Sequence, residues 1–208
     1  ARFTFTAVHS EGGLLPHELL ERVAALDNGL PDLGPTAYYL AEHEPLGEAI
    51  SRSWLRLLGC WRALRAALDK LPAGDAAVRL TRERWLYPLF QELGFGRLTT
   101  TRSQPLELDG RTFPISHVVG PVPIHLLGTG VDLDRATKGV EGATQPPHSL
   151  VQDLLNRSEA HLWALLSNGL RLRLLRDHHS LTRQAYVEFD LEAIFAGERF
   201  ADFRLLWL

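Results

Sequence analysis

The sequence predicts an α/β (α+β) fold, in which a helical N-terminal part precedes a mixed β-sheet flanked by helices. Three observations lead to this prediction. Residues 50–71 carry apolar side chains at helical spacing, an Asn-Gly pair separates two apolar runs, and helix and strand patterns alternate after residue 81. We expect a helical subdomain over residues 1–75 and an α/β subdomain over residues 76–208.

The Asn168-Gly169 pair predicts a hairpin between strands at residues 162–167 and 170–176. Asn and Gly tolerate the positive φ that both central residues of a type I′ turn require, so this turn type is expected. Leucine and arginine alternate along the second strand, which gives it one apolar and one positively charged face.

The first third of the chain predicts mainly helices. Phe3 and Phe5 alternate with a polar residue and suggest a short strand. Residues 17–26 have the amphipathic pattern of a helix, and residues 38–42 suggest one further short helix. The clearest helix spans residues 50–71, where apolar residues recur every three or four positions: Ile50, Trp54, Leu57, Trp61, Leu64, Leu68 and Leu71. Such a seam could form an intermolecular coiled coil, but we expect it to pack within the chain.

The remaining two thirds predict alternating helices and strands. Thr81 is expected to cap a helix that runs to Leu93, with a kink at Pro88. Residues 128–147, rich in Gly, Thr and Pro, predict a loop. The other elements are strands at 97–102 and 122–127, a hairpin at 106–115 around Asp109-Gly110, a helix at 149–156, a strand at 183–189, and short helices from Asp190 and from Arg199.

The composition is that of an ordinary globular protein, with 45% hydrophobic and 23% charged residues among 208 and a net charge of −3. A chain with this net charge does not attract nucleic acid or anionic lipid as a whole, so binding to either would need a local patch of positive charge. The single cysteine, Cys60, excludes an internal disulfide and favours a reducing, cytoplasmic location. We expect Cys60 to be a small buried hydrophobe, and no apolar run approaches the roughly 18 residues of a membrane helix.

Both ends of the sequence suggest a piece of a longer polypeptide. The chain starts at Ala1, contains no methionine, and stops in the apolar run Leu205–Leu208. An exposed apolar end without a polar cap is unfavourable in water.

Residues 81–208 resemble the N-terminal region of Eco57I-like adenine-specific DNA methyltransferases, which belong to bacterial restriction–modification and to the BREX and DISARM phage-defence systems. The likeness is carried by the ending Leu93-Gly-Phe95 of a helix, a β-rich middle, and four later segments. These segments are Leu155-Asn-Arg-Ser-Glu159, residues 162–173 around Asn168-Gly169, Tyr186-Val-Glu-Phe-Asp-Leu-Glu-Ala-Ile-Phe195 and Phe200-Ala-Asp-Phe203.

The resemblance implies a degenerate restriction-endonuclease-like (PD-(D/E)xK) fold upstream of a methyltransferase domain. That nuclease motif needs an acid on one strand and Glu/Asp-x-Lys on the next, but residues 122–127 contain neither carboxylate nor lysine. Glu107 and Asp109 lie before this strand, but the strand itself supplies neither the acid nor the lysine that would complete the motif. The chain also lacks the Asn-Pro-Pro-aromatic signature and the Gly-rich cofactor loop of methyltransferases.

We therefore expect a non-catalytic accessory module that needs no cofactor of its own. S-adenosylmethionine would serve the parent enzyme, which would methylate adenine N6. The expected partners are DNA and other subunits of the defence system, and no membrane. The candidate DNA-backbone contacts form a stripe across two neighbouring strands: Arg171, Arg173, Arg176 and Arg183. The alternative is a solvated sheet face on which these arginines pair with Glu188 or Asp190.

Two other classes of function stay open. A metal-dependent nuclease or phosphoesterase could use carboxylates and an imidazole as ligands: Asp132, Asp134, Asp177 and His178. A protein-interaction scaffold could use the apolar seam of residues 50–71.

Three further histidine and serine positions have simpler interpretations. His117 and His125 are expected to be core or edge histidines with satisfied ring nitrogens. A triad of Ser116, His117 and Asp109 lacks the Gly-x-Ser-x-Gly elbow that would expose a nucleophile.

Overall fold

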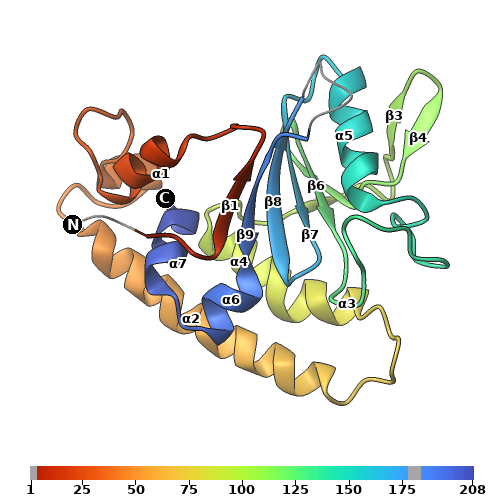
Figure 1. Cartoon of the computed structure of the whole chain (residues 1–208), viewed down its shortest axis with the longest axis horizontal. Helices are drawn as coiled ribbons and strands as arrows, with labels where there is room; N and C mark the ends of the chain where they lie inside the picture. Colours follow the sequence, from red (N-terminus) through yellow and green to blue (C-terminus); the bar gives the residue numbers. More distant parts are fainter. Residues whose placement is uncertain (1–3, 178–183) are drawn as a thin grey trace.

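A computed structural model describes residues 4–177 and 184–208 and confirms the mixed α/β class (Figure 1). Its main sheet has the strand order β1-β9-β8-β7-β6-β5-β2, in which β6 and β7 are parallel and every other neighbouring pair is antiparallel. The strands are β1 (Val8–Glu11), β2 (Thr99–Thr100), β5 (His117–Val119), β6 (Val122–Leu126), β7 (Trp163–Ser167), β8 (Arg171–Arg176) and β9 (Tyr186–Asp190). A separate two-stranded sheet pairs β3 (Leu106–Leu108) with β4 (Arg111–Phe113).

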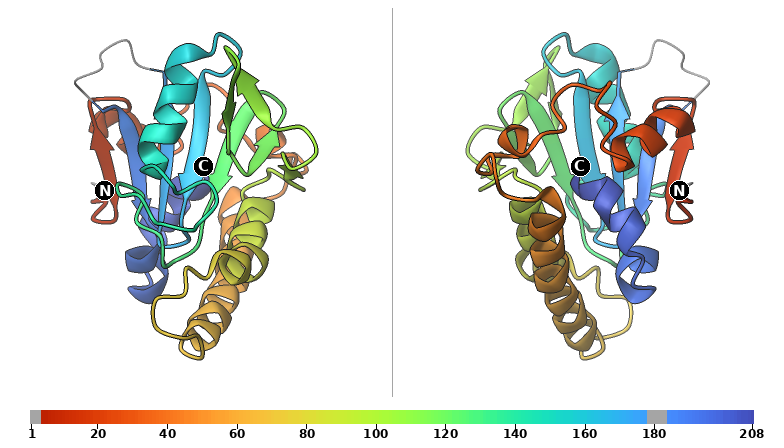
Figure 2. Two further views of the ribbon diagram at one scale, coloured as in Figure 1. Left: turned by 90° about the vertical axis from the view of Figure 1, so that its right-hand side faces the viewer. Right: turned by 90° about the vertical axis from the view of Figure 1, so that its left-hand side faces the viewer.

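Helices cover both faces of the main sheet. They are α1 (His17–Ala24), α2 (Leu46–Leu68), α3 (Val78–Thr81), α4 (Tyr87–Glu92), α5 (Pro147–Arg157), α6 (Leu191–Ala196) and α7 (Phe200–Trp207). The larger core joins α2, the helical segment 78–92, α6 and α7 to one face of the sheet. The smaller core joins α5 and β4 to the other face. Figure 2 shows α2 and the segment 78–92 side by side below the sheet.

The apolar seam predicted for residues 50–71 packs inside the chain, as expected. Trp61 is buried and its ring lies 5.3 Å from that of Trp85 and 6.2 Å from that of Phe195. The helix ends at Leu68 rather than Leu71, and a turn leads to the segment 78–92. The expected boundary between residues 75 and 76 lies in this connection, and side chains from both sides of it share one core.

The N-terminal part differs from the predictions. The first strand of the described residues is Val8–Glu11, which pairs with β9; Phe3 of the predicted strand lies outside the described residues, and Phe5 packs against a small core that contains Leu20. A 3₁₀ turn at Pro35–Tyr38 replaces the helix expected at 38–42. This turn begins early because Pro35 presets its first φ, and it ends because Tyr39 adopts the left-handed conformation with φ of 59°.

The helix predicted to start at Thr81 starts at Val78. The Thr81 hydroxyl does not cap it, because this oxygen accepts a hydrogen bond of 3.2 Å from the backbone N–H of Thr129. The predicted disturbance at Pro88 is present as a π-helical turn, Arg82–Leu86, immediately before α4. Proline lacks the N–H that a regular helix would donate, and the wider π turn occurs where that bond is missing.

The two predicted turns differ in outcome. Asp109 and Gly110 have φ of 52° and 72°, which fits the type I′ turn of the β3–β4 hairpin. At the β7–β8 hairpin only Gly169 has a positive φ, of 86°, so the predicted type I′ turn was wrong. The Asn168 side chain explains the difference, because its Oδ1 accepts from the backbone N–H of both Leu170 and Arg171 at 3.0 Å.

The later predictions agree more closely with the structure. The helix α5, the strand β9 and both C-terminal helices are present, and Asp190 caps α6 through the backbone N–H of Ala193. The strand β5 was missed, and β2 is shorter than the predicted strand 97–102.

The apolar C-terminal run is partly covered rather than exposed. The Tyr38 ring stacks on Trp207 with centroids 5.0 Å apart, and the Tyr38 hydroxyl donates to the Leu208 carbonyl. Cys60 is half-buried against the larger core, and burial raises the pKa of its thiol. Within residues 4–177 and 184–208, no helix has the length and apolarity needed to span a membrane.

Candidate anion-binding site

The arginines predicted as a DNA-binding stripe are engaged with acids along β8 and β9. Arg173 is buried, and it donates to Glu188 Oε2 at 2.6 Å and to both Asp134 oxygens at 2.6 and 2.8 Å. Arg171 donates to Glu188 Oε1 at 2.8 Å and lies 3.7 Å from Asp190. The pairing with Glu188 and Asp190 is that of the alternative weighed above, but Arg173 and Glu188 are buried rather than solvated.

The remaining stripe residues lie at the other end of β8. Arg176 lies over the ring of Trp163 and within 3.4 Å of Asp177. Arg183 lies outside the described residues. DNA binding by the stripe stays a prediction, and Arg173 could reach a phosphate only by leaving Glu188 and Asp134.

The acids of the metal-enzyme hypothesis make local contacts instead of converging. Asp132 accepts from the backbone N–H of Asp134, whose own carboxylate binds Arg173. Asp177 lies beside Arg176, and His178 lies outside the described residues. Over the described part of the chain, no three histidine, cysteine or acidic side chains are grouped as metal ligands would be.

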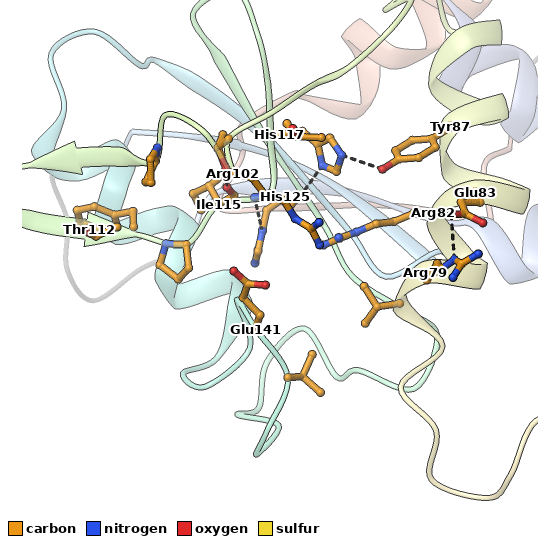
Figure 3. A pocket seen from close by; sticks show the side chains of 18 of the residues that line it. Arg79, Arg82, Glu83, Tyr87, Arg102, Thr112, Ile115, His117, His125 and Glu141 are labelled. Atoms are coloured by element: carbon orange, nitrogen blue, oxygen red, sulfur yellow. Dashed lines mark hydrogen bonds and ion pairs between the residues drawn. The ribbon is translucent and has the colours of Figure 1, made fainter.

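A cavity of about 780 Å³ lies elsewhere, between the segment 78–92, the strands β2, β5 and β6, the β4 end and the loop 128–146 (Figure 3). Basic and hydroxyl side chains dominate its polar lining: Arg79, Arg82, Arg102, Tyr87, Thr100, Thr101 and Thr112. Two acids, Glu83 and Glu141, also line it. No sequence pattern singled out this site.

Arg82 is the central cation of the cavity. The π turn Arg82–Leu86 directs this half-buried side chain across β6, where its Nε donates to the Leu126 carbonyl at 2.9 Å and Nη2 donates to the same oxygen. Among the described residues no carboxylate lies within ion-pair distance of Arg82, and burial lowers the pKa of its guanidinium. A desolvated arginine that binds only a neutral carbonyl keeps strong donor capacity for an anion.

The neighbouring arginines differ in their partners. Arg79 forms an ion pair of 3.1 Å with Glu83, and Arg102 is exposed at the end of β2 without an acid partner in the described structure. On α2, by contrast, every arginine pairs with a glutamate: Arg52 with Glu44, Arg56 with Glu92, Arg62 with Glu198 and Arg65 with Glu192. Arg82 and Arg102 thus line the cavity without an acid partner in the described structure, unlike the four arginines of α2.

The two predicted core histidines are buried in the wall of this cavity with satisfied nitrogens, as expected. His117 contacts the Ser116 hydroxyl at 2.7 Å and the Tyr87 hydroxyl at 2.9 Å. His125 Nδ1 accepts from the Ser116 N–H at 3.2 Å, and its Nε2 donates to the Gly142 carbonyl at 2.8 Å. Burial lowers the pKa of both rings to about 4, so both are neutral at pH 7.

Ser116 ties two strands together and is not an exposed nucleophile. Its hydroxyl accepts from the Leu126 N–H at 2.8 Å and lies 3.2 Å from the Ile124 carbonyl. Asp109 is in the β3–β4 turn and makes no contact with His117. A base with its pKa lowered to about 4 is also a weak acceptor for a serine proton. The triad is therefore not formed.

Comparisons with protein families, with curated proteins and with solved structures found no match for this chain. The functional interpretation therefore depends on the chemistry of the cavity and on the sequence resemblance. The cavity is cationic, contains hydroxyl donors and has no grouped carboxylates. This chemistry suits the binding of an anion rather than the holding of a metal ion by acids.

Proposed function

We propose that this chain is a non-catalytic, nucleic-acid-binding module that holds a backbone phosphate in the cavity. The observation that carries the proposal is Arg82, a half-buried cation with no acid partner in the described structure, at the wall of a cavity that Arg102 also lines. Arginine donates paired hydrogen bonds to phosphate oxygens, and these bonds strengthen where water is excluded.

The resemblance supplies the larger context that we propose for this module. It would belong to an Eco57I-like adenine-specific DNA methyltransferase and would act with DNA and other defence-system subunits, while the parent uses S-adenosylmethionine. The position of the cavity supports the nuclease-like likeness, because it lies against β5 and β6, two successive paired strands. A nuclease motif would place its carboxylates on such strands, and here they present His117 and His125.

The test measures the affinity for a fluorescent single-stranded oligonucleotide by anisotropy over a series of salt concentrations. The double variant Arg82→Ala/Arg102→Ala is expected to weaken binding and to reduce the slope of log K against log salt by about one to two, since about 0.7 to 1 unit accompanies each lost phosphate contact. Circular dichroism checks that the variant is folded.

A matched control separates this site from other cations. Arg62→Ala removes an exposed arginine of α2 that pairs with Glu198, and it is expected to leave the slope unchanged. Arg171→Ala tests the β8 stripe in the same assay. An unchanged slope in Arg82→Ala/Arg102→Ala, or a loss confined to Arg171→Ala, would contradict binding at the cavity.

A further inference from the structure

A carboxylate lies opposite the central cation of the cavity. Figure 3 shows Glu141 reaching in from the loop 128–146, while Arg82 reaches in from the helical segment on the other side. Glu141 is exposed and forms no ion pair or hydrogen bond within the described structure, whereas Glu83 is paired with Arg79. The cavity thus offers an anion-binding group and a hydrogen-bond acceptor whose charge acts on Arg82 from beyond ion-pair distance.

The loop holds Glu141 in this place through close packing. The His125 ring donates to the Gly142 carbonyl, and a Cβ added at Gly142 would lie 2.5 Å from the ring Cε1. Gly142 also has a φ of 77°, which favours glycine. The residue next to Glu141 is therefore fixed against β6, so the backbone position from which Glu141 projects belongs to the fold.

The cavity is larger than a phosphate group requires. Its volume of about 780 Å³ is in the range of small-molecule sites, and Pro105, Pro114 and Val140 add an apolar part to the lining. An apolar wall suits the flat face of a base, and a carboxylate accepts hydrogen bonds from the exocyclic amino group of cytosine.

We infer that the cavity holds one whole nucleotide whose base carries an exocyclic amino group. The phosphate binds Arg82 and Arg102, the base packs against the apolar wall, and the amino group donates to Glu141. This inference depends on the proposed function, which requires only a backbone phosphate at the same arginines.

The test compares two nucleotides whose bases differ at position 4 and in the proton on N3. Isothermal titration calorimetry measures the Kd of deoxycytidine 5′-monophosphate, which carries an amino group at position 4 and an unprotonated N3, and of deoxyuridine 5′-monophosphate, which carries a carbonyl there and an N3–H. The wild-type protein is expected to prefer the cytidine nucleotide about tenfold. Glu141→Gln is expected to abolish this preference, mainly by weakening the binding of the cytidine nucleotide.

A control variant and inorganic phosphate complete the experiment. Glu159→Gln removes an exposed glutamate outside the cavity and is expected to keep the preference. Equal affinities in the wild type would overturn the inference. So would tighter binding of both nucleotides and of inorganic phosphate by Glu141→Gln, because Glu141 would then only repel anions.

The two proposals fail in distinguishable ways. If the nucleotides bind equally but Arg82→Ala/Arg102→Ala loses oligonucleotide binding, only the base-specific inference is wrong. If that double variant binds the oligonucleotide like the wild type, the proposed function itself is wrong.

Discussion

Arg173 shows how one residue can satisfy a sequence pattern and still take an unexpected role. Its side chain is 6% exposed, two acids bind it, and it lies over the ring of Tyr186 at 4.8 Å. The acids raise the pKa of the guanidinium, although desolvation by burial opposes them. The hydrogen bonds from Arg173 in turn lower the pKa of Asp134. The residue is therefore part of the buried structure of the sheet.

We predict that Arg173→Ala lowers the free energy of unfolding by about 3–5 kcal/mol, because it leaves Glu188 buried with reduced compensation. Arg176→Ala is the matched change on the same strand. Since Arg176 is half-exposed, it is expected to cost less than about 1 kcal/mol. Urea denaturation followed by circular dichroism measures both values, and equal losses would show that the Arg173 ion pairs contribute no more than a surface contact.

The helix α2 shows what a sequence pattern predicts well at the scale of an element. The three- and four-residue spacing of its apolar positions predicted both the helix and the buried face, since local periodicity determines both. The same reasoning predicted the wrong type for the β7–β8 turn. There the Asn168 side chain donates to the Val131 carbonyl at 2.8 Å, a contact between residues far apart in the sequence.

We predict that Trp61→Ala destabilises the protein by about 3–5 kcal/mol, because it removes a buried ring of the larger core. Leu55 lies on the same helix but is 69% exposed, and Leu55→Ala is expected to cost less than about 0.5 kcal/mol. Thermal unfolding at two protein concentrations measures both. A melting temperature that rises with concentration would indicate that the seam also pairs between chains.

The candidate cavity could not be predicted from the sequence for a related reason. Arg82, Glu141, His117 and His125 come from a π turn, a loop and two strands, and no short motif links them. The strand β5, which carries His117, is only three residues long and was not recognised. Long-range packing assembles the site, whereas sequence patterns report mainly local periodicity and turns.

At the scale of the whole molecule, buried neutral histidines lie both on strands of the sheet and on a helix that covers it. His117 and His125 border the anion-binding cavity, and His148 lies in α5 with Nδ1 3.0 Å from Arg173 Nη1. Burial and the charge of Arg173 together lower the pKa of His148 to about 4, and burial is also the main cause of the lowered pKa of the other two. The fold therefore holds three imidazoles in the neutral form on separate elements.

These three groups predict a loss of stability in mild acid. Their folded pKa values of about 4 lie below the value near 6.5 that the unfolded chain has, so the unfolded state binds more protons between these pH values. The contribution of these histidines to the free energy of unfolding is fully present above about pH 6.5 and is lost as the pH falls toward 4. For each histidine, the free energy of unfolding is expected to fall by about 1.5 kcal/mol between pH 6.5 and 5.

Urea denaturation at pH 7.5, 6.5, 5.5 and 5.0 measures this dependence in a range where carboxylates contribute little, because their unfolded pKa values lie near 4. His125→Gln removes one titrating group while its amide can still donate to the Gly142 carbonyl. The variant is expected to be less stable at pH 7.5 but to lose less stability toward pH 5. A wild-type stability that stays constant from pH 7.5 to 5.0 would mean that these imidazoles accept protons in the folded state, and that the walls of the cavity carry more positive charge than the geometry indicates.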